Sequence, residues 1–267
     1  MQTKMISYRN QPLSYQLTGS GLPVVLVHGF GETVDVWQQQ VHHLEKKYRL
    51  ILPGISGSGL SVYNPELISL DDYAGSIKTI LEAENIPVCA MLGHSMGGYI
   101  AMAFAVNFPK MLNALGLMHS SAAADNQEKI ATRKKSIEFI LSNGSAAYFK
   151  TSVPGLFSEK WAAANPLAVQ ELIEQVSFLL PEALAQQQQA MIGRPDRTEV
   201  LKNFSRPVLF IMGKQDKAVP FDIIMPQCYL PAESHIHILE QSGHMGMWEE
   251  PEKTNAALTG FLGRIYA

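Results

Sequence analysis

Five short, mostly apolar runs constrain the fold of this chain more than any other feature. They are PVVLV (23–27), YRLIL (48–52), VCAML (88–92), ALGLM (114–118) and PVLFIM (207–212). Near-continuous apolar runs of this length are typical of strands buried on both faces of a sheet. Helical patterns separate the first runs, at residues 36–47 and 70–84. Such alternation predicts a doubly wound, mostly parallel sheet covered by helices on both faces.

The remaining segments extend this sheet at both edges. Two alternating pieces, MISY and LSYQL, flank a turn-prone RNQP and predict an antiparallel hairpin. HIHILE (235–240) adds a last strand, and a helix is expected from about 250 to 265. We therefore predict an α/β fold with an eight-stranded sheet. Residues 120–203 read as helical throughout, which predicts a helical subdomain inserted into a core of residues 1–119 and 204–267.

Composition limits the class of partner. The net charge is −3, with 46% hydrophobic and 17% charged residues, so the chain lacks the clustered basic charge that nucleic-acid binding requires. The N-terminal segment has no apolar core of the secretory type, and His94 and Ser95 interrupt the longest apolar run. We expect a cytoplasmic protein, monomeric or homodimeric, that binds neither nucleic acid nor membrane.

The stretch GHSMGG (93–98) is the strongest chemical motif. It follows a buried strand and precedes the small-residue helical run ending at Pro109. This is the context of a nucleophile elbow, in which a serine sits on a tight turn between strand and helix. A glycine turn in a phosphate-binding loop is the alternative, but no G-x-G-x-x-G or GK[ST] pattern is present. Ser95 is therefore the predicted nucleophile.

A nucleophilic serine needs a base and an acid that orients the base. His244 lies after the last predicted strand, and Asp216 in GKQDKAVP directly follows the strand PVLFIM. Both positions are at the carboxyl ends of strands, where the elbow also points. The chain order of nucleophile, acid and base, Ser95, Asp216 and His244, is a specific signal for this kind of site. Asp125 is a weaker candidate for the acid.

Backbone N–H groups can supply an oxyanion hole beside this serine. HGFGE (28–32) follows the strand PVVLV, and we assign the donors to the N–H groups of Phe30 and Met96. No cofactor or metal is expected. His235 and His237 share one strand face, but no third ligand lies near them in sequence. Cys89 and Cys228 fit no disulfide or metal pattern and are expected in the core.

Together these motifs resemble the α/β-hydrolase fold superfamily, in the branch of small esterases, enol-lactonases, carbon–carbon bond hydrolases and cofactor-free haloperoxidases. The resemblance covers the whole predicted core. It implies a triad of Ser95, Asp216 and His244, and a cap formed by the helical insertion over a pocket above the serine. One departure is Gly54 in ILPGISGSGLS, where many members have an aspartate.

The leading hypothesis is a serine hydrolase that cleaves a small to medium, largely apolar ester, thioester or lactone through an acyl-serine. The expected partner is thus a small ester-like molecule. Side chains predicted to contact it are His119, Phe139, Phe157, Trp161 and Met245.

Two other hypotheses remain open from sequence. One is a carbon–carbon bond hydrolase or enol-lactonase whose acidic substrate is held by Arg133, Arg194 or Arg197. The other is a small-molecule receptor that retains the triad.

Overall fold

The computed structural model describes residues 1–267 and contains one eight-stranded sheet with the order β1-β2-β4-β3-β5-β6-β7-β8. The first two strands are antiparallel to each other, and β2 is antiparallel to β4; the other pairs are parallel. The predicted mostly parallel, eight-stranded α/β sheet is confirmed. The strands are β1 (Gln2–Tyr8), β2 (Gln11–Thr18), β3 (Leu22–Val27), β4 (Tyr48–Pro53), β5 (Cys89–His94), β6 (Leu112–Met118), β7 (Val208–Gly213) and β8 (Ser234–Leu239).

Each central strand contributes to two hydrophobic cores, one on each face of the sheet. In β3, Val25 and Val27 belong to one core, and Val24 and Leu26 belong to the other. This follows from the two-residue period of a strand, and it explains why these strands read as continuous apolar runs. The sheet is therefore covered on both sides.

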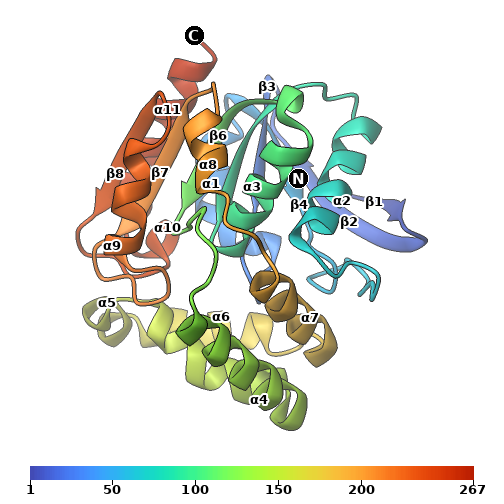
Figure 1. Cartoon of the computed structure of the whole chain (residues 1–267), viewed down its shortest axis with the longest axis vertical. Coiled ribbons are helices and arrows are strands. Elements are labelled where there is room, and N and C mark those ends of the chain that lie inside the picture. The colour runs from blue at the N-terminus through green and yellow to red at the C-terminus, as the bar shows by residue number, and fades with distance from the viewer.

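Helices cover the two faces in pairs (Figure 1). On one face α2 (Leu70–Ala83) packs beside α3 (Met96–Asn107), and on the other α1 (Gln38–Leu44) packs beside α11 (Pro251–Ile265). A capping box starts α2, in which Ser69 accepts from the Asp72 N–H and Asp72 accepts from the Ser69 N–H. Short helices complete the core: η1 (Val34–Trp37), η2 (Pro109–Met111), α9 (Phe221–Ile224), η4 (Met225–Tyr229) and α10 (Gly246–Glu249).

Between β6 and β7 the chain is helical, and most of this segment lies beyond one end of the sheet (Figure 1). Helix α4 is interrupted at Gly144, whose φ of 82° and ψ of 165° are not helical. The last helix of the predicted insertion, α8, packs on α3 in the core instead of with the others. The elements are α4 (Gln127–Ser152), η3 (Val153–Leu156), α5 (Glu159–Ala164), α6 (Pro166–Val176), α7 (Pro181–Ile192) and α8 (Thr198–Asn203).

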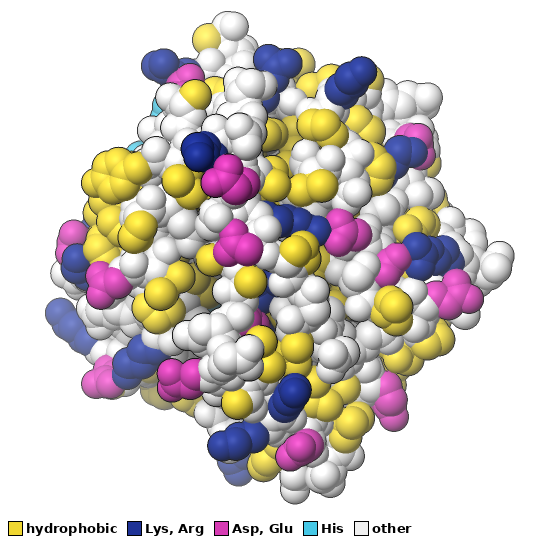
Figure 2. All heavy atoms as spheres, viewed as in Figure 1, with side chains coloured by type: hydrophobic (Ala, Val, Ile, Leu, Met, Phe, Trp, Pro, Cys, Tyr) yellow, Lys and Arg dark blue, Asp and Glu magenta, His cyan; other side chains and the backbone are white.

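No helix combines the length and apolar composition needed to cross a membrane. On the face shown in Figure 2, basic and acidic side chains are interspersed with apolar ones.

Candidate active site

Ser95 occupies a strained turn between β5 and α3. Its φ of 52° and ψ of −118° lie outside the regions that L-residues favour. The turn also requires a close approach between α3 and β3, because a Cβ on Gly97 would lie 2.2 Å from the carbonyl oxygen of Val27. The Ser95 N–H donates to Met118 O at 2.9 Å, and its carbonyl accepts from the Ser120 hydroxyl at 2.7 Å. Neighbouring strand ends therefore hold the turn in place.

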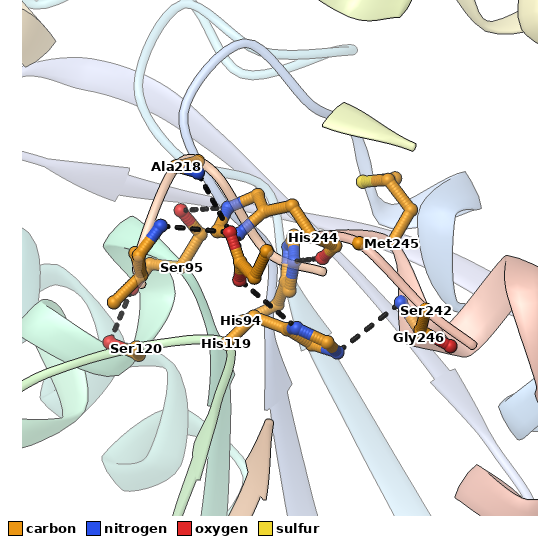
Figure 3. A network of polar contacts seen from close by, with 12 residues as sticks. His94, Ser95, His119, Ser120, Ala218, Ser242, His244, Met245 and Gly246 are labelled. Atoms are coloured by element: carbon orange, nitrogen blue, oxygen red, sulfur yellow. Dashed lines mark hydrogen bonds and ion pairs between the residues drawn. The ribbon is translucent and has the colours of Figure 1, made fainter. Parts of the chain in front are cut away.

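The structure brings the three predicted triad residues together, and Figure 3 shows Ser95 beside His244. The Ser95 hydroxyl lies 2.9 Å from His244 Nε2, and His244 Nδ1 lies 2.7 Å from Asp216 Oδ2. Since the carboxylate can only accept, Nδ1 carries a proton and, in the neutral ring, Nε2 is free to accept from the serine. This is the arrangement that a serine–histidine–acid relay requires.

A second histidine contacts the same acid. His119, directly after β6, lies with Nδ1 3.3 Å from Asp216 Oδ2. Its Nε2 accepts from the Gly246 N–H at 3.2 Å, so the proton of the neutral ring is on Nδ1 and points to Asp216. Burial lowers the pKa of His119 to about 4, which keeps the ring neutral. His119 was predicted to contact substrate; instead it is fully buried behind the acid.

Asp216 receives four hydrogen bonds. Its Oδ1 accepts from the N–H groups of Ala218 and Val219, both at 2.8 Å, while Oδ2 faces the two histidines. Burial alone would raise the pKa of Asp216, but the interaction with His244 and these hydrogen bonds hold it well below its usual range. The acid therefore remains ionised beside His244.

A buried ion pair lies behind the elbow. His94 Nδ1 is 2.9 Å from Glu32 Oε1, and its Nε2 is 2.9 Å from the carbonyl of His244. Both partners are acceptors, so both ring nitrogens donate and the imidazole is charged. Burial alone would lower the pKa of His94, but the Glu32 carboxylate raises it overall. Glu32 also accepts from the Gly29 N–H at 2.6 Å. This pair therefore connects the loop after β3 to the loop between β8 and α10 that carries His244, which we call the histidine loop.

Of the two groups assigned to the oxyanion hole, Met96 follows Ser95 directly in the chain and Phe30 belongs to the loop after β3. The N–H groups of Phe30 and Met96 have no hydrogen-bond partner within the protein. Phe30 also lines the cavity that contains Ser95, whereas the Met96 side chain is fully buried in the core. Both backbone donors are thus unoccupied at the elbow.

A cavity leads from the cap to Ser95 and His244, with an empty volume of about 790 Å³ that includes the part open to solvent. Its wall contains side chains from α4, η3, α6 and α7 together with the loops after β3 and β7. Apolar residues dominate it, including Phe30, Tyr148, Phe149, Val153, Leu156, Leu172, Val176 and Met191.

None of the five side chains predicted to contact substrate lines this cavity. Phe139 faces solvent with 40% of its surface exposed, because it lies on the outer side of α4. Phe157 stacks on Trp161 with ring centroids 4.7 Å apart, and both pack in the hydrophobic core that extends from the cap onto one face of the sheet. Met245 is fully buried among core residues, and His119 serves Asp216.

The three arginines considered as partners of an acidic substrate lie in different surroundings. Arg197 pairs with Asp71 at 2.7 Å, and Arg194 pairs with Asp125 at 2.9 Å while lying over the ring of Tyr99. Only Arg133 lines the cavity, accompanied by Lys129, which sequence reasoning missed. The available signal was the four-residue spacing of Lys129 and Arg133, which places both cations on the same face of a helix.

The triad histidine and its neighbours also form the one group with metal-ligand character. His119, Asp216 and His244 have potential ligand atoms within 4.8 Å of one another. Their hydrogen bonds already account for Nδ1 of both rings and for Nε2 of His119. The arrangement is that of an oriented base and acid.

Comparison with known proteins agrees with this geometry. A family model described as "Alpha/beta hydrolase family" matches residues 24–257. The chain is 25% identical over 261 residues to a putative carbamate hydrolase RutD from Azorhizobium caulinodans, covering 95% of this chain and 96% of that protein. It is 25% identical to a 2-hydroxy-6-oxononadienedioate/2-hydroxy-6-oxononatrienedioate hydrolase from a Pseudomonas species, covering 90% and 88%. A malate-bound thermophilic esterase from Thermogutta terrifontis superimposes with a TM-score of 0.94 at 26% identity, covering 100% of both chains.

Proposed function

The chain belongs to the alpha/beta hydrolase family and has the fold of a hydrolase, and from this premise we propose that it cleaves carboxylic esters, thioesters or lactones through an acyl-serine intermediate. The observation that carries the proposal is the continuous contact from Ser95 through His244 to the ionised Asp216. Names of similar proteins cover carbamates, esters and diacid derivatives, so they support hydrolysis without selecting the bond.

The proposed reaction begins with proton transfer from the Ser95 hydroxyl to His244 Nε2 as the oxygen attacks the substrate carbonyl. The imidazolium that forms is stabilised by Asp216, which lies 2.7 Å from Nδ1. The free N–H groups of Phe30 and Met96 then hold the oxyanion. His244 returns its proton to the leaving group, and the same histidine activates the water that releases the acid.

The test is steady-state hydrolysis of p-nitrophenyl esters from acetate to decanoate. We expect Ser95→Ala to lower kcat by at least about a thousandfold. Ser152→Ala is the matched control, because Ser152 lines the same cavity without contacting a histidine. The chain-length optimum measures the apolar part of the pocket. A fluorophosphonate should phosphonylate Ser95 with loss of fluoride, so that the peptide containing Ser95 gains the mass of the reagent minus HF. Labelling elsewhere, or full activity in Ser95→Ala, would contradict the proposal.

A further inference from the structure

Two cations enter an otherwise mostly apolar cavity. Lys129 and Arg133 lie four residues apart on α4, so they project from one face of the helix, and both line the cavity that reaches Ser95. Neither side chain contacts Ser95, Asp216 or His244 through a hydrogen bond. Lys129 Nζ donates to the carbonyl of Ala218, in the loop after β7. An apolar ester offers these two groups no partner.

The Arg133 guanidinium is fixed in position with one nitrogen unoccupied. Its Nε donates to Asp125 Oδ2 at 2.5 Å, and its Nη1 donates to Gln188 Oε1 at 2.9 Å. Nη2 has no partner, and only 11% of the side chain is exposed. A guanidinium oriented by two hydrogen bonds loses little freedom when it binds an anion.

The positive charge around this helix face is only partly neutralised. Asp125 is shared between Arg133 and Arg194, and Lys129 forms no ion pair. Glu32, the acid in the cavity wall, is paired with His94. Burial lowers the pKa of Lys129, as expected for an ammonium without a carboxylate partner. Lys129, Arg133 and Arg194 therefore lie near two carboxylates, Asp125 and the triad residue Asp216, which leaves one positive charge in excess.

We propose that Lys129 and Arg133 form a subsite for a carboxylate of the substrate. The substrate class is an ester, thioester or lactone that carries a free carboxylate at the end remote from the scissile carbonyl. The carboxylate would accept from Arg133 Nη2 and the Lys129 ammonium, while the apolar walls enclose the connecting carbons and the carbonyl reaches Ser95. Charge-assisted hydrogen bonds of this kind are among the stronger ones in proteins. The inference rests on the proposed ester hydrolysis.

The kinetic test compares monomethyl esters of glutaric, adipic and suberic acids with methyl esters of monocarboxylic acids of the same length. We expect the acidic esters to be preferred, mainly through a lower KM. Lys129→Met and Arg133→Gln should each reduce the ratio of kcat/KM for acidic over neutral esters by about ten- to a hundredfold. Lys135→Met, an exposed cation on the same helix, is the matched control and should leave the ratio unchanged. Circular dichroism checks that each variant is folded.

A ratio that does not change in Lys129→Met and Arg133→Gln would overturn the subsite while leaving the serine mechanism intact. If no ester shows Ser95-dependent hydrolysis, the proposed function fails and binding decides the subsite. Calorimetry with adipate and with neutral dimethyl adipate then gives the answer. Saturable binding of adipate alone, lost in Arg133→Gln, would support the subsite, and absence of adipate binding to the wild type would overturn it.

Discussion

His119 shows how a single buried side chain can stabilise the charge of a neighbour without touching substrate. It stays neutral and donates to Asp216 Oδ2, the same oxygen that accepts from His244. Its φ of 49° is unusual for a residue other than glycine, and strained backbone of this kind persists where surrounding contacts impose it. His119 is therefore a positioning residue for the acid of the triad.

The neutral state of His119 predicts a pH dependence of stability. Its pKa is about 4 in the folded protein, against the ordinary histidine value of 6.5 expected in the unfolded chain. Between these values the unfolded chain binds a proton that the folded protein does not, so the free energy of unfolding falls as the pH falls. This group should contribute about 2 kcal/mol of loss between about pH 7 and about pH 5.

Urea unfolding of the wild type and His119→Gln at the two pH values measures this contribution. We expect a smaller loss in the variant, whatever its absolute stability. His42→Gln, which removes an exposed histidine, should behave as the wild type. If the free energy of unfolding changes with pH equally in the wild type and in His119→Gln, then protonation of His119 does not contribute to the pH dependence of stability.

At the scale of elements, the elbow depends on how closely α3 approaches β3. A Cβ at Gly97 would lie 2.2 Å from Val27 O and 2.7 Å from His28 O, both backbone atoms. Gly97→Ala must therefore displace the helix or the strand. We expect it to destabilise the protein by about 1–3 kcal/mol and to abolish Ser95-dependent turnover.

Gly260→Ala provides a control of opposite sign. Gly260 lies within α11 and has no neighbouring atom within 4 Å of an added Cβ. Alanine there should raise the free energy of unfolding by about 0.5–1 kcal/mol. Thermal unfolding of both variants tests the contrast, and a similar shift in the two would mean that the close contact at the elbow is not limiting.

The sequence allowed prediction of the sheet and of the meeting of Ser95, Asp216 and His244. Ser95 and Asp216 follow buried strands, His244 follows the alternating edge strand β8, and parallel strands end at one edge of a sheet. It did not allow prediction of the cavity wall. Which face of a cap helix points inward depends on packing between helices and on the interruption at Gly144, neither of which local pattern encodes. Phe157 and Trp161 illustrate this, because their rings stack on each other and neither side chain lines the cavity.

At the scale of the whole molecule, Glu249 joins the cap to the histidine loop. Its carboxylate accepts from the N–H groups of Gly243 and Met245 at 2.8 and 3.2 Å and from the cap residue Ser158 at 2.8 Å. The His244 N–H in turn donates to Leu156 O at 2.6 Å. The base of the triad is thus supported by the element that also lines the cavity.

Glu249→Ala should loosen both segments together, because it leaves buried N–H groups without acceptors. We expect a loss of about 2 kcal/mol or more in unfolding free energy and a lower kcat. Hydrogen exchange should increase in peptides spanning 156–158 and 243–245, and not in Glu252→Ala, an exposed change on α11. Faster exchange in the histidine loop alone would indicate that the cap is held independently of Glu249.

The chain leaves the core and returns to it at adjacent points. The N–H of Arg197 donates to the carbonyl of Ala122 at 2.8 Å, so the helices between them form a loop whose ends are already closed. The entropy of closing the connection between β6 and β7 therefore depends only weakly on the length of the segment inside it. A change of length or sequence there would alter the cavity wall and leave in place the strand ends that hold Ser95 and Asp216.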